Sequence, residues 1–169
     1  QEGGRVARLK PPAWRKAPPA EVFADLYLKD EEAAIEATRI NHRLLAHELR
    51  TIGIDVDCAP VADLRIEGAD AIIGDRAFGR TPEPIAHLGR AAMDGLMAGG
   101  VAPIIKHIPG HGRARADSHL ELPVVPEEHG LLSETDFAPF KALADAPMAM
   151  TAHIVYADID DSAPATQSA

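Results

Sequence analysis

The residues best suited to chemistry lie close together in one segment of the chain, residues 106–119. This segment reads Lys-His-Ile-Pro-Gly-His-Gly over residues 106–112 and Asp-Ser-His over residues 117–119. A histidine has an ordinary pKa of about 6.5, so it can give or take a proton near neutral pH. A carboxylate two residues away, as Asp117 is from His119, can hydrogen-bond one ring nitrogen and raise the basicity of the other. The pattern is typical of an acid/base site in a loop.

The same side chains are also possible metal ligands, which gives a second hypothesis. His107, His111, Asp117 and His119 are residue types that bind zinc or iron, and His107 and His111 have the i,i+4 spacing of a helical ligand pair. Pro109 and Gly110 stand between those two histidines and disfavour a regular helix there. A metal-dependent hydrolase therefore remains the alternative to metal-free acid/base chemistry.

The segments that must position these residues alternate between helix and strand. Asp30 is suited to cap the first helix, and Ile35, Ala37, Ile40, Leu44, Leu45 and Leu49 follow it at helical spacing. Thr81 and Pro82 are suited to begin a second helix, and Gly99 and Gly100 to end it. Ser133 and Asp136 resemble a capping box for a third helix that ends near Asp145. The predicted strands are 54–60, 101–106 and 148–154, and residues 1–19 are predicted to be loop.

Strands that alternate with helices imply parallel βα units, so the fold class is α/β. Polar residues stand at or just after the end of each predicted strand: Asp63, then Lys106 and His107, then His153. This recurrence favours a (β/α)₈ TIM barrel, whose active site gathers the carboxyl ends of its strands. A doubly wound sheet is the runner-up, but the chain has no glycine-rich phosphate loop. Three strands cannot close an eight-stranded barrel, so either the chain is a barrel fragment or the barrel prediction is wrong.

Single residues of these elements carry simpler predictions. His42 and His47 on the first long helix are expected at the surface or its boundary. Cys58 is expected to be a small buried residue of the strand 54–60, in which Ile54, Val56 and Cys58 alternate with Asp55 and Asp57. Asp63 and His153 are expected to hydrogen-bond the neighbouring loop rather than a ligand.

Composition narrows the choice of partners. The chain has 169 residues and a formal net charge of -9, which argues against nucleic acid or an anionic membrane as its main partner. Its one cysteine cannot form an intrachain disulfide, so a reducing compartment is the simplest expectation. The sequence shows no signal peptide and no apolar run of transmembrane length.

Several segments together resemble glycoside hydrolase family 3, in its bacterial β-N-acetylglucosaminidase branch. They occur in the order Q-E-G-G-R-V at 1–6, A-P-V-A-D-L at 59–64, I-G-D-R-A-F at 73–78, K-H-I-P-G-H-G at 106–112, D-S-H at 117–119 and A-H-I-V-Y-A-D-I-D at 152–160. The resemblance covers nearly the whole chain. It implies that residues 1–169 are the central part of a TIM-barrel catalytic domain, a partial N-terminal domain of that family.

The resemblance also implies roles for particular residues. His119 corresponds to the catalytic acid/base and Asp117 to the aspartate that assists it. Arg8, Arg76, Lys106 and His107 correspond to the sugar-binding residues, and no metal or cofactor is expected. A further sugar-binding aspartate is expected immediately before Gln1.

The implied enzyme is a retaining β-N-acetylhexosaminidase that forms a covalent glycosyl-enzyme intermediate. Its nucleophilic aspartate is expected on a strand after Ala169, so this chain alone is expected to be inactive. The implied substrate is N-acetylglucosamine β-linked to an anhydro-muramoyl peptide, released during peptidoglycan recycling in the cytoplasm. A non-catalytic sugar-binding homologue remains the alternative outside enzymes.

Overall fold

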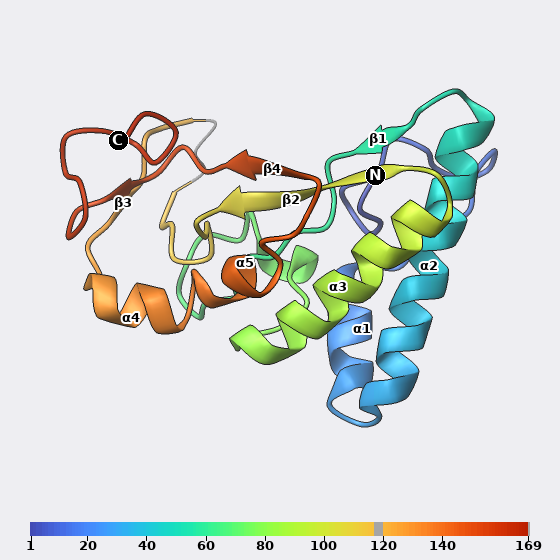
Figure 1. Cartoon of the computed structure of the whole chain (residues 1–169), viewed down its shortest axis with the longest axis horizontal. Helices are drawn as coiled ribbons and strands as arrows, with labels where there is room; N and C mark the ends of the chain where they lie inside the picture. The colour runs from blue at the N-terminus through green and yellow to red at the C-terminus, as the bar shows by residue number, and fades with distance from the viewer. Residues whose placement is uncertain (117–119, 169) are drawn as a thin grey trace.

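Parallel strands and helices alternate along the chain in the computed structural model, which describes residues 1–116 and 120–168 (Figure 1). This confirms the predicted α/β class. The helices are α1 (Ala20–Tyr27), α2 (Glu31–Thr51), α3 (Pro82–Ala98), α4 (His129–Glu134) and α5 (Ala138–Ala142), with a short 3₁₀ helix η1 (Gly74–Arg76). The strands are β1 (Val56–Asp57), β2 (Ala102–Ile108), β3 (Val124–Val125), β4 (Met148–Thr151) and β5 (Val155–Tyr156).

The main sheet has the order β1-β2-β4, and both pairings in it are parallel. Val56 is in register with Ala102, and Ile104 with Met148. Parallel neighbours bring their carboxyl ends to the same edge of the sheet, so the segments that follow β1, β2 and β4 meet there. A second, smaller parallel pair joins β3 to β5 beyond that edge.

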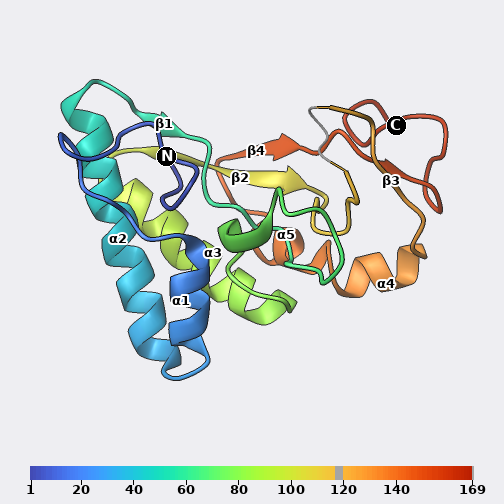
Figure 2. The same ribbon diagram turned by 180° about the vertical axis from the view of Figure 1, so that it is seen from behind.

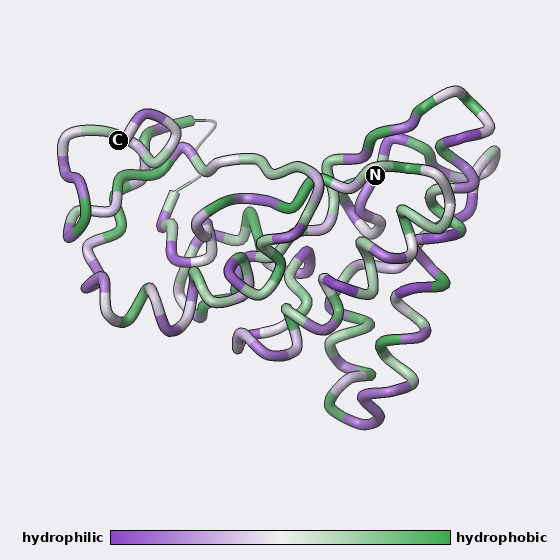
Figure 3. Tube along the Cα trace, viewed as in Figure 1, coloured by the Kyte–Doolittle hydropathy of each residue, from purple (hydrophilic) through white to green (hydrophobic). Residues whose placement is uncertain are grey.

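The long helices pack together beside the sheet, as both views show (Figure 1, Figure 2). Helices α2 and α3 make the most extensive contact between elements, and α3 also packs on β2. The apolar core between helices and sheet contains, among others, Phe23, Leu64, Phe78, Ile85, Leu88, Met93, Ile105, Phe140 and Leu143. Hydrophobic and hydrophilic stretches alternate along the helices, as expected for helices that bury one face (Figure 3).

The predicted start of α2 and both predicted ends of α3 are confirmed. The side chain of Asp30 accepts a hydrogen bond from the backbone N–H of Ala33 at 3.0 Å, which caps α2. Helix α3 begins at Pro82 and ends against Gly99, as its sequence predicts. Strand β2 extends two residues beyond the predicted end at Lys106.

For residues 54–60, the prediction of which side chains face the core is wrong. Ile54 and Val56 are 38% and 42% exposed, and Cys58 is exposed, whereas Asp57 is 5% exposed. The reason is that Asp57 points under the N-terminal segment, where its carboxylate accepts a hydrogen bond from the backbone nitrogen of Gln1 at 2.7 Å. The alternation of apolar and acidic residues along this segment does not indicate which of its two faces the N-terminal segment covers.

Two helix predictions also need correction. Helix α1 lies in a segment for which no helix was predicted, and its Phe23 packs against His42, which is 3% exposed rather than at the surface. The single helix predicted from Ser133 to Asp145 is instead two short helices, α4 and α5. Asp136 does not cap either one, because its buried carboxylate pairs with Arg113.

No helix within the described ranges is long and apolar enough to cross a membrane.

Candidate active site

A hollow of about 620 Å³ opens at the carboxyl edge of the main sheet. Strand ends and the N-terminal segment both contribute to its wall. The lining residues are Glu2, Val6, Ile72, Ile73, Arg76, Lys106, His107, His111, Met150, Thr151, Ala152 and His153. The wall therefore combines apolar side chains with cations and imidazoles, which suits a small polar ligand that also has apolar surface.

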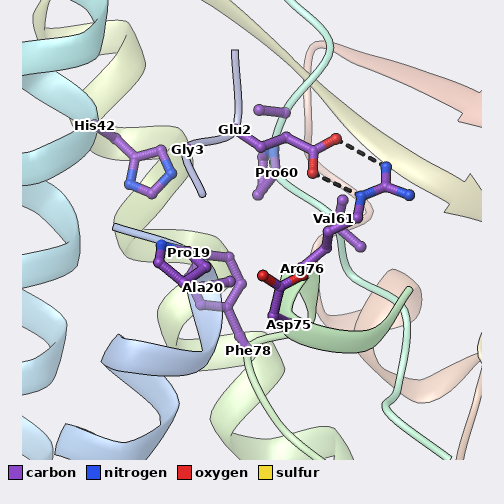
Figure 4. A pocket seen from close by; sticks show the side chains of 11 residues that line it. Glu2, Gly3, Pro19, Ala20, His42, Pro60, Val61, Asp75, Arg76 and Phe78 are labelled. Carbon is purple, nitrogen blue, oxygen red and sulfur yellow. Dashed lines mark hydrogen bonds and ion pairs between the residues drawn. The ribbon is translucent and has the colours of Figure 1, made fainter. Parts of the chain in front are cut away.

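Glu2 holds two cations of this wall in place. Its carboxylate accepts two hydrogen bonds from Arg76, Nε to Oε2 and Nη2 to Oε1, each 2.8 Å long (Figure 4). The Lys106 ammonium lies 2.6 Å from Oε1 of the same carboxylate. The side chains of all three residues are nearly buried, with exposed fractions of 9 to 11%.

The charges of this cluster determine its protonation. Burial alone would raise the pKa of Glu2, but the hydrogen bond from Arg76 and the charge of Lys106 outweigh it and lower that pKa. Burial would likewise lower the pKa of Arg76, and the Glu2 carboxylate raises it instead. The cluster therefore carries one negative and two positive charges at neutral pH. Its excess positive charge faces the hollow and can donate charge-assisted hydrogen bonds to hydroxyl or carbonyl oxygens.

Asp63 fixes the backbone and the ring at the end of β2. It is fully buried, and its Oδ2 lies 2.7 Å from Nδ1 of His107. Its Oδ1 accepts hydrogen bonds from the backbone N–H groups of His111 at 2.7 Å and of His107 at 3.3 Å. Burial would raise the pKa of Asp63, but these donors outweigh it and lower the pKa. The prediction that Asp63 bonds the loop is confirmed.

The loop after β2 is fastened by close contacts at its base. The Tyr156 hydroxyl donates a hydrogen bond to the carbonyl of Gly110. Nε of Arg113 lies 2.6 Å from the buried carboxylate of Asp136. At Gly112 the backbone passes so close to Leu64 that an added Cβ would lie 2.2 Å from the Leu64 carbonyl oxygen. These contacts determine where the loop leaves the sheet on its way to residue 117.

The structure brings together three of the predicted sugar-binding residues, Arg76, Lys106 and His107, in the wall of one hollow. Arg8 is exposed and does not line this hollow; its backbone N–H donates to the side chain of Gln1. The predicted catalytic residues Asp117 and His119 lie outside the described residues. The sugar-binding roles of all four residues, and the catalytic roles of these two, stay predictions.

Glu2 is the member of the site that the sequence analysis did not identify. It stands within the Q-E-G-G-R-V segment, beside the glycines that shape the turn, and that position was the available signal. Gly3 and Gly4 both have positive φ, and an added Cβ would lie 2.3 Å from the Pro18 carbonyl oxygen at Gly3 and 2.7 Å from Cβ of Pro19 at Gly4. The tight turn they allow is what brings Glu2 to Arg76 and Lys106.

Two histidines of the described part of the site, His107 and His111, lie close to each other. The ring centroids of His107 and His111 are 5.5 Å apart. Burial lowers the pKa of His111, which favours its neutral form. Within residues 1–116 and 120–168, no group of three or more histidine, cysteine, aspartate or glutamate side chains is placed to hold a metal ion.

Known proteins resemble this chain closely. Over 162 residues it is 42% identical to a beta-hexosaminidase of Alkalilimnicola ehrlichii. The aligned segment covers 95% of this chain and 46% of that protein. The chain superposes on the crystal structure of native NagZ from Neisseria gonorrhoeae with a TM-score of 0.89 and 39% identity, covering 96% of this chain and 48% of that one. A second structure, of the same NagZ in complex with N-trifluoroacetyl-D-glucosamine, gives a TM-score of 0.89 at 39% identity, over 96% of this chain and 47% of that one.

The chain spans less than half the length of these relatives. The family model described as the glycosyl hydrolase family 3 N terminal domain matches it over residues 1–169. That match and the 42% identity leave one conclusion: this chain belongs to glycosyl hydrolase family 3.

Proposed function

We propose that the complete protein is a retaining β-N-acetylhexosaminidase that removes terminal β-linked N-acetylglucosamine. The observation that carries this proposal is the convergence of Arg76, Lys106 and His107 in one hollow at the carboxyl edge of a parallel sheet. A sugar with many hydroxyl groups needs several fixed hydrogen-bond donors, and charged donors form the stronger bonds. The apolar wall at Val6, Ile72 and Met150 suits the carbon faces of such a ring.

The fold we propose for the complete protein is a (β/α)₈ barrel, of which residues 1–169 form a central part. Three parallel strands in the order β1-β2-β4, with helices between consecutive strands, support this proposal. The hollow lies where barrel enzymes keep their active sites, at the carboxyl ends of strands.

In the proposed reaction, His119 protonates the leaving glycosidic oxygen while a carboxylate attacks the anomeric carbon. The same histidine then removes a proton from water, and the resulting attack releases the sugar with its configuration retained. Asp117 orients His119. The attacking carboxylate is expected on the strand predicted after Ala169. Arg76 and Lys106 hold sugar oxygens, and no metal enters any step.

The substrate class is part of this proposal. The gonococcal NagZ was crystallised with N-trifluoroacetyl-D-glucosamine, which supports an N-acylated glucosamine as the sugar recognised here. We propose N-acetylglucosamine linked to an anhydro-muramoyl peptide as the natural substrate, in peptidoglycan recycling, and the cytoplasm as its location. Purified muropeptides and cell fractionation test these two points.

The experiment that tests the activity is turnover of p-nitrophenyl β-N-acetylglucosaminide by the full-length protein. We expect nitrophenol release, with little release from the matching β-glucoside, and the β-anomer as the first product seen by NMR. His119→Ala should abolish turnover and leave the folded state intact.

Other outcomes favour the alternatives. No turnover by a folded protein that still binds N-acetylglucosamine would favour a sugar-binding homologue. Turnover that disappears with a chelator would favour a metal-dependent hydrolase.

A further inference from the structure

Arg5 makes an unusual set of contacts next to the hollow. Its Nε donates to Oδ1 of Asp75 at 2.8 Å. Its Nη2 donates to the backbone carbonyls of Ala71 and Ile72, each at 2.7 Å, and of Ile73 at 3.3 Å. The Arg5 guanidinium thus contacts three successive backbone carbonyls of the turn that leads into η1. It also contacts the side chain of Asp75, which follows that turn.

This turn also carries Arg76, one of the cations of the hollow. Nη1 of Arg76 donates to the carbonyl of Ile72 at 2.9 Å, so the two guanidinium groups share one acceptor. Two ion pairs therefore join the same two segments, Glu2 with Arg76 and Arg5 with Asp75. Asp75 and Arg76 both line the small cavity drawn in Figure 4.

The turn forms part of the wall of the hollow. Ile72 and Ile73 line the hollow, and their carbonyls are two of the three that Arg5 contacts. Gly74 follows the held carbonyls with φ of +47°, a left-handed conformation that favours glycine. The position of this turn fixes both the apolar wall and the anchor of the Arg76 side chain.

We propose that Arg5 is a positioning residue of the sugar site, acting through the 71–73 turn and Arg76. This inference rests on the proposed glycosidase function. Without Arg5 the turn loses an ion pair and the Nη2 group that its three carbonyls share, and Arg76 loses the fixed carbonyl that holds its Nη1. Arg76 then keeps its charge and its hydrogen bonds to Glu2 but loses one of the two groups that fix its direction, so substrate binding weakens while proton transfer at the loop is unaffected.

Because Arg5 is partly exposed, its positioning role can be distinguished from a general contribution to folding stability. Its side chain is 44% exposed and that of Asp75 is 30% exposed. Exposed ion pairs contribute little to folding stability, typically less than about 1 kcal/mol. The consequence of removing Arg5 should therefore appear in substrate affinity more than in the midpoint of unfolding.

The test is Arg5→Gln in the full-length protein with the aryl N-acetylglucosaminide. We expect KM to rise roughly tenfold, as for the loss of hydrogen bonds to a charged group, with kcat changed by less than about twofold. Arg90→Gln is the matched control. Arg90 also binds a carboxylate, Asp145, and a backbone carbonyl, that of Ala142, but it lies away from the hollow. Its KM should be that of the wild type.

A second set of variants tests the route through Arg76. Arg5→Lys keeps the charge but cannot bridge three carbonyls and a carboxylate, so its KM should also rise. In the double variant of Arg5→Gln with Arg76→Lys, KM should be close to that of Arg76→Lys alone. If each substitution instead raised KM by its own independent factor in the double variant, Arg5 would not act through Arg76.

The outcomes separate this inference from the proposed function. An inactive, folded wild-type protein would overturn the proposed function. An active wild type with equal KM in Arg5→Gln and Arg90→Gln would overturn the role of Arg5 alone. Hydrogen exchange of residues 70–77 gives a readout that does not need activity. It should be faster in Arg5→Gln and unchanged in Arg90→Gln.

Discussion

The carboxylate of Asp63 determines which nitrogen of His107 carries a proton. Oδ2 of Asp63 lies 2.7 Å from Nδ1 of His107, and the pKa of Asp63 is lowered because its hydrogen-bond donors outweigh the effect of burial. An ionised carboxylate only accepts hydrogen bonds, so Nδ1 must be the donor. His107 is also part of the wall of the hollow, so its tautomer matters to any ligand bound there.

Asp63→Asn should therefore impair the site more than the fold. The amide can present either its oxygen or its NH₂ group to Nδ1, so the tautomer of His107 is no longer fixed. We expect kcat/KM to fall roughly tenfold to a hundredfold, as for other residues that orient a functional histidine. Steady-state kinetics of the full-length protein measure this. Asp94→Asn, at an exposed position of α3, should leave kcat/KM unchanged, and equal values in the two variants would contradict the role of Asp63.

Glu2→Gln should destabilise the protein. The change leaves Arg76 and Lys106 nearly buried without a compensating charge, and breaking a buried ion pair from one side typically costs about 3 to 5 kcal/mol. We expect the free energy of unfolding in urea to fall by about 3 kcal/mol. Glu36→Gln is the control, because its pair with Arg39 is exposed to solvent and should contribute little to stability. Losses of equal size would refute a special role for the Glu2 cluster.

The sequence predicts this site better than it predicts the packing around it. Lys106 and His107 lie at the end of a buried strand, and the strand end indicates where they lie because parallel strands share one carboxyl edge. Glu2 was not identified, because its partners are far along the chain, at Arg76 and Lys106. Local patterns do not contain that information.

The incorrect predictions for the helices have the same cause, namely contacts with residues that are distant in the sequence. Asp136 has the local sequence of a capping residue, but a partner 23 residues away, Arg113, takes its carboxylate. His42 was expected near the surface because the helix that covers it was not predicted. Helix α1 follows two prolines and has no side-chain cap, so its start lacks the usual signal.

His42 should make the protein less stable in acid. Its burial lowers its pKa from 6.5 to about 4, while in the unfolded chain the pKa stays near 6.5. The unfolded state therefore binds a proton first as the pH falls. The stability that the neutral ring provides is complete above pH 6.5 and is lost progressively as the pH falls toward about 4. A pKa difference of this size corresponds to a loss of at most about 3 kcal/mol in the free energy of unfolding.

Urea unfolding measured from pH 7.5 to pH 4 tests this prediction. His42→Phe keeps an aromatic ring between Phe23 and Phe78, and its stability should fall less steeply with acid than that of the wild type. His47→Gln changes an exposed histidine of the same helix and should keep the wild-type slope. The same slope in all three proteins would show that His42 does not govern the acid response.

Metal removal should leave the activity unchanged. The proposed chemistry uses His119, Asp117 and a carboxylate, and none of its steps needs a Lewis acid. Dialysis of the full-length protein against a chelator should therefore preserve kcat with the aryl substrate. Loss of activity that returns on adding one particular divalent metal would instead support the metal-dependent alternative.

Gly112→Ala should displace the loop that leads toward the predicted acid/base residue. An added Cβ at this position would lie 2.2 Å from the carbonyl oxygen of Leu64 and 3.0 Å from its carbonyl carbon, both rigid backbone atoms. The loop must move away from Leu64, and overpacking of this kind typically costs about 1 to 3 kcal/mol. We expect that loss of stability together with a fall in kcat, because the displaced backbone continues to residue 117.

Gly130→Ala is the matched control for this change. Nothing lies within 4 Å of a Cβ added at Gly130, which is inside helix α4. Alanine is the better helix former, so this variant should keep its kcat and gain up to about 1 kcal/mol in stability. If Gly112→Ala matched Gly130→Ala in both kcat and stability, the close passage of the loop at Leu64 would have no part in the function of the site.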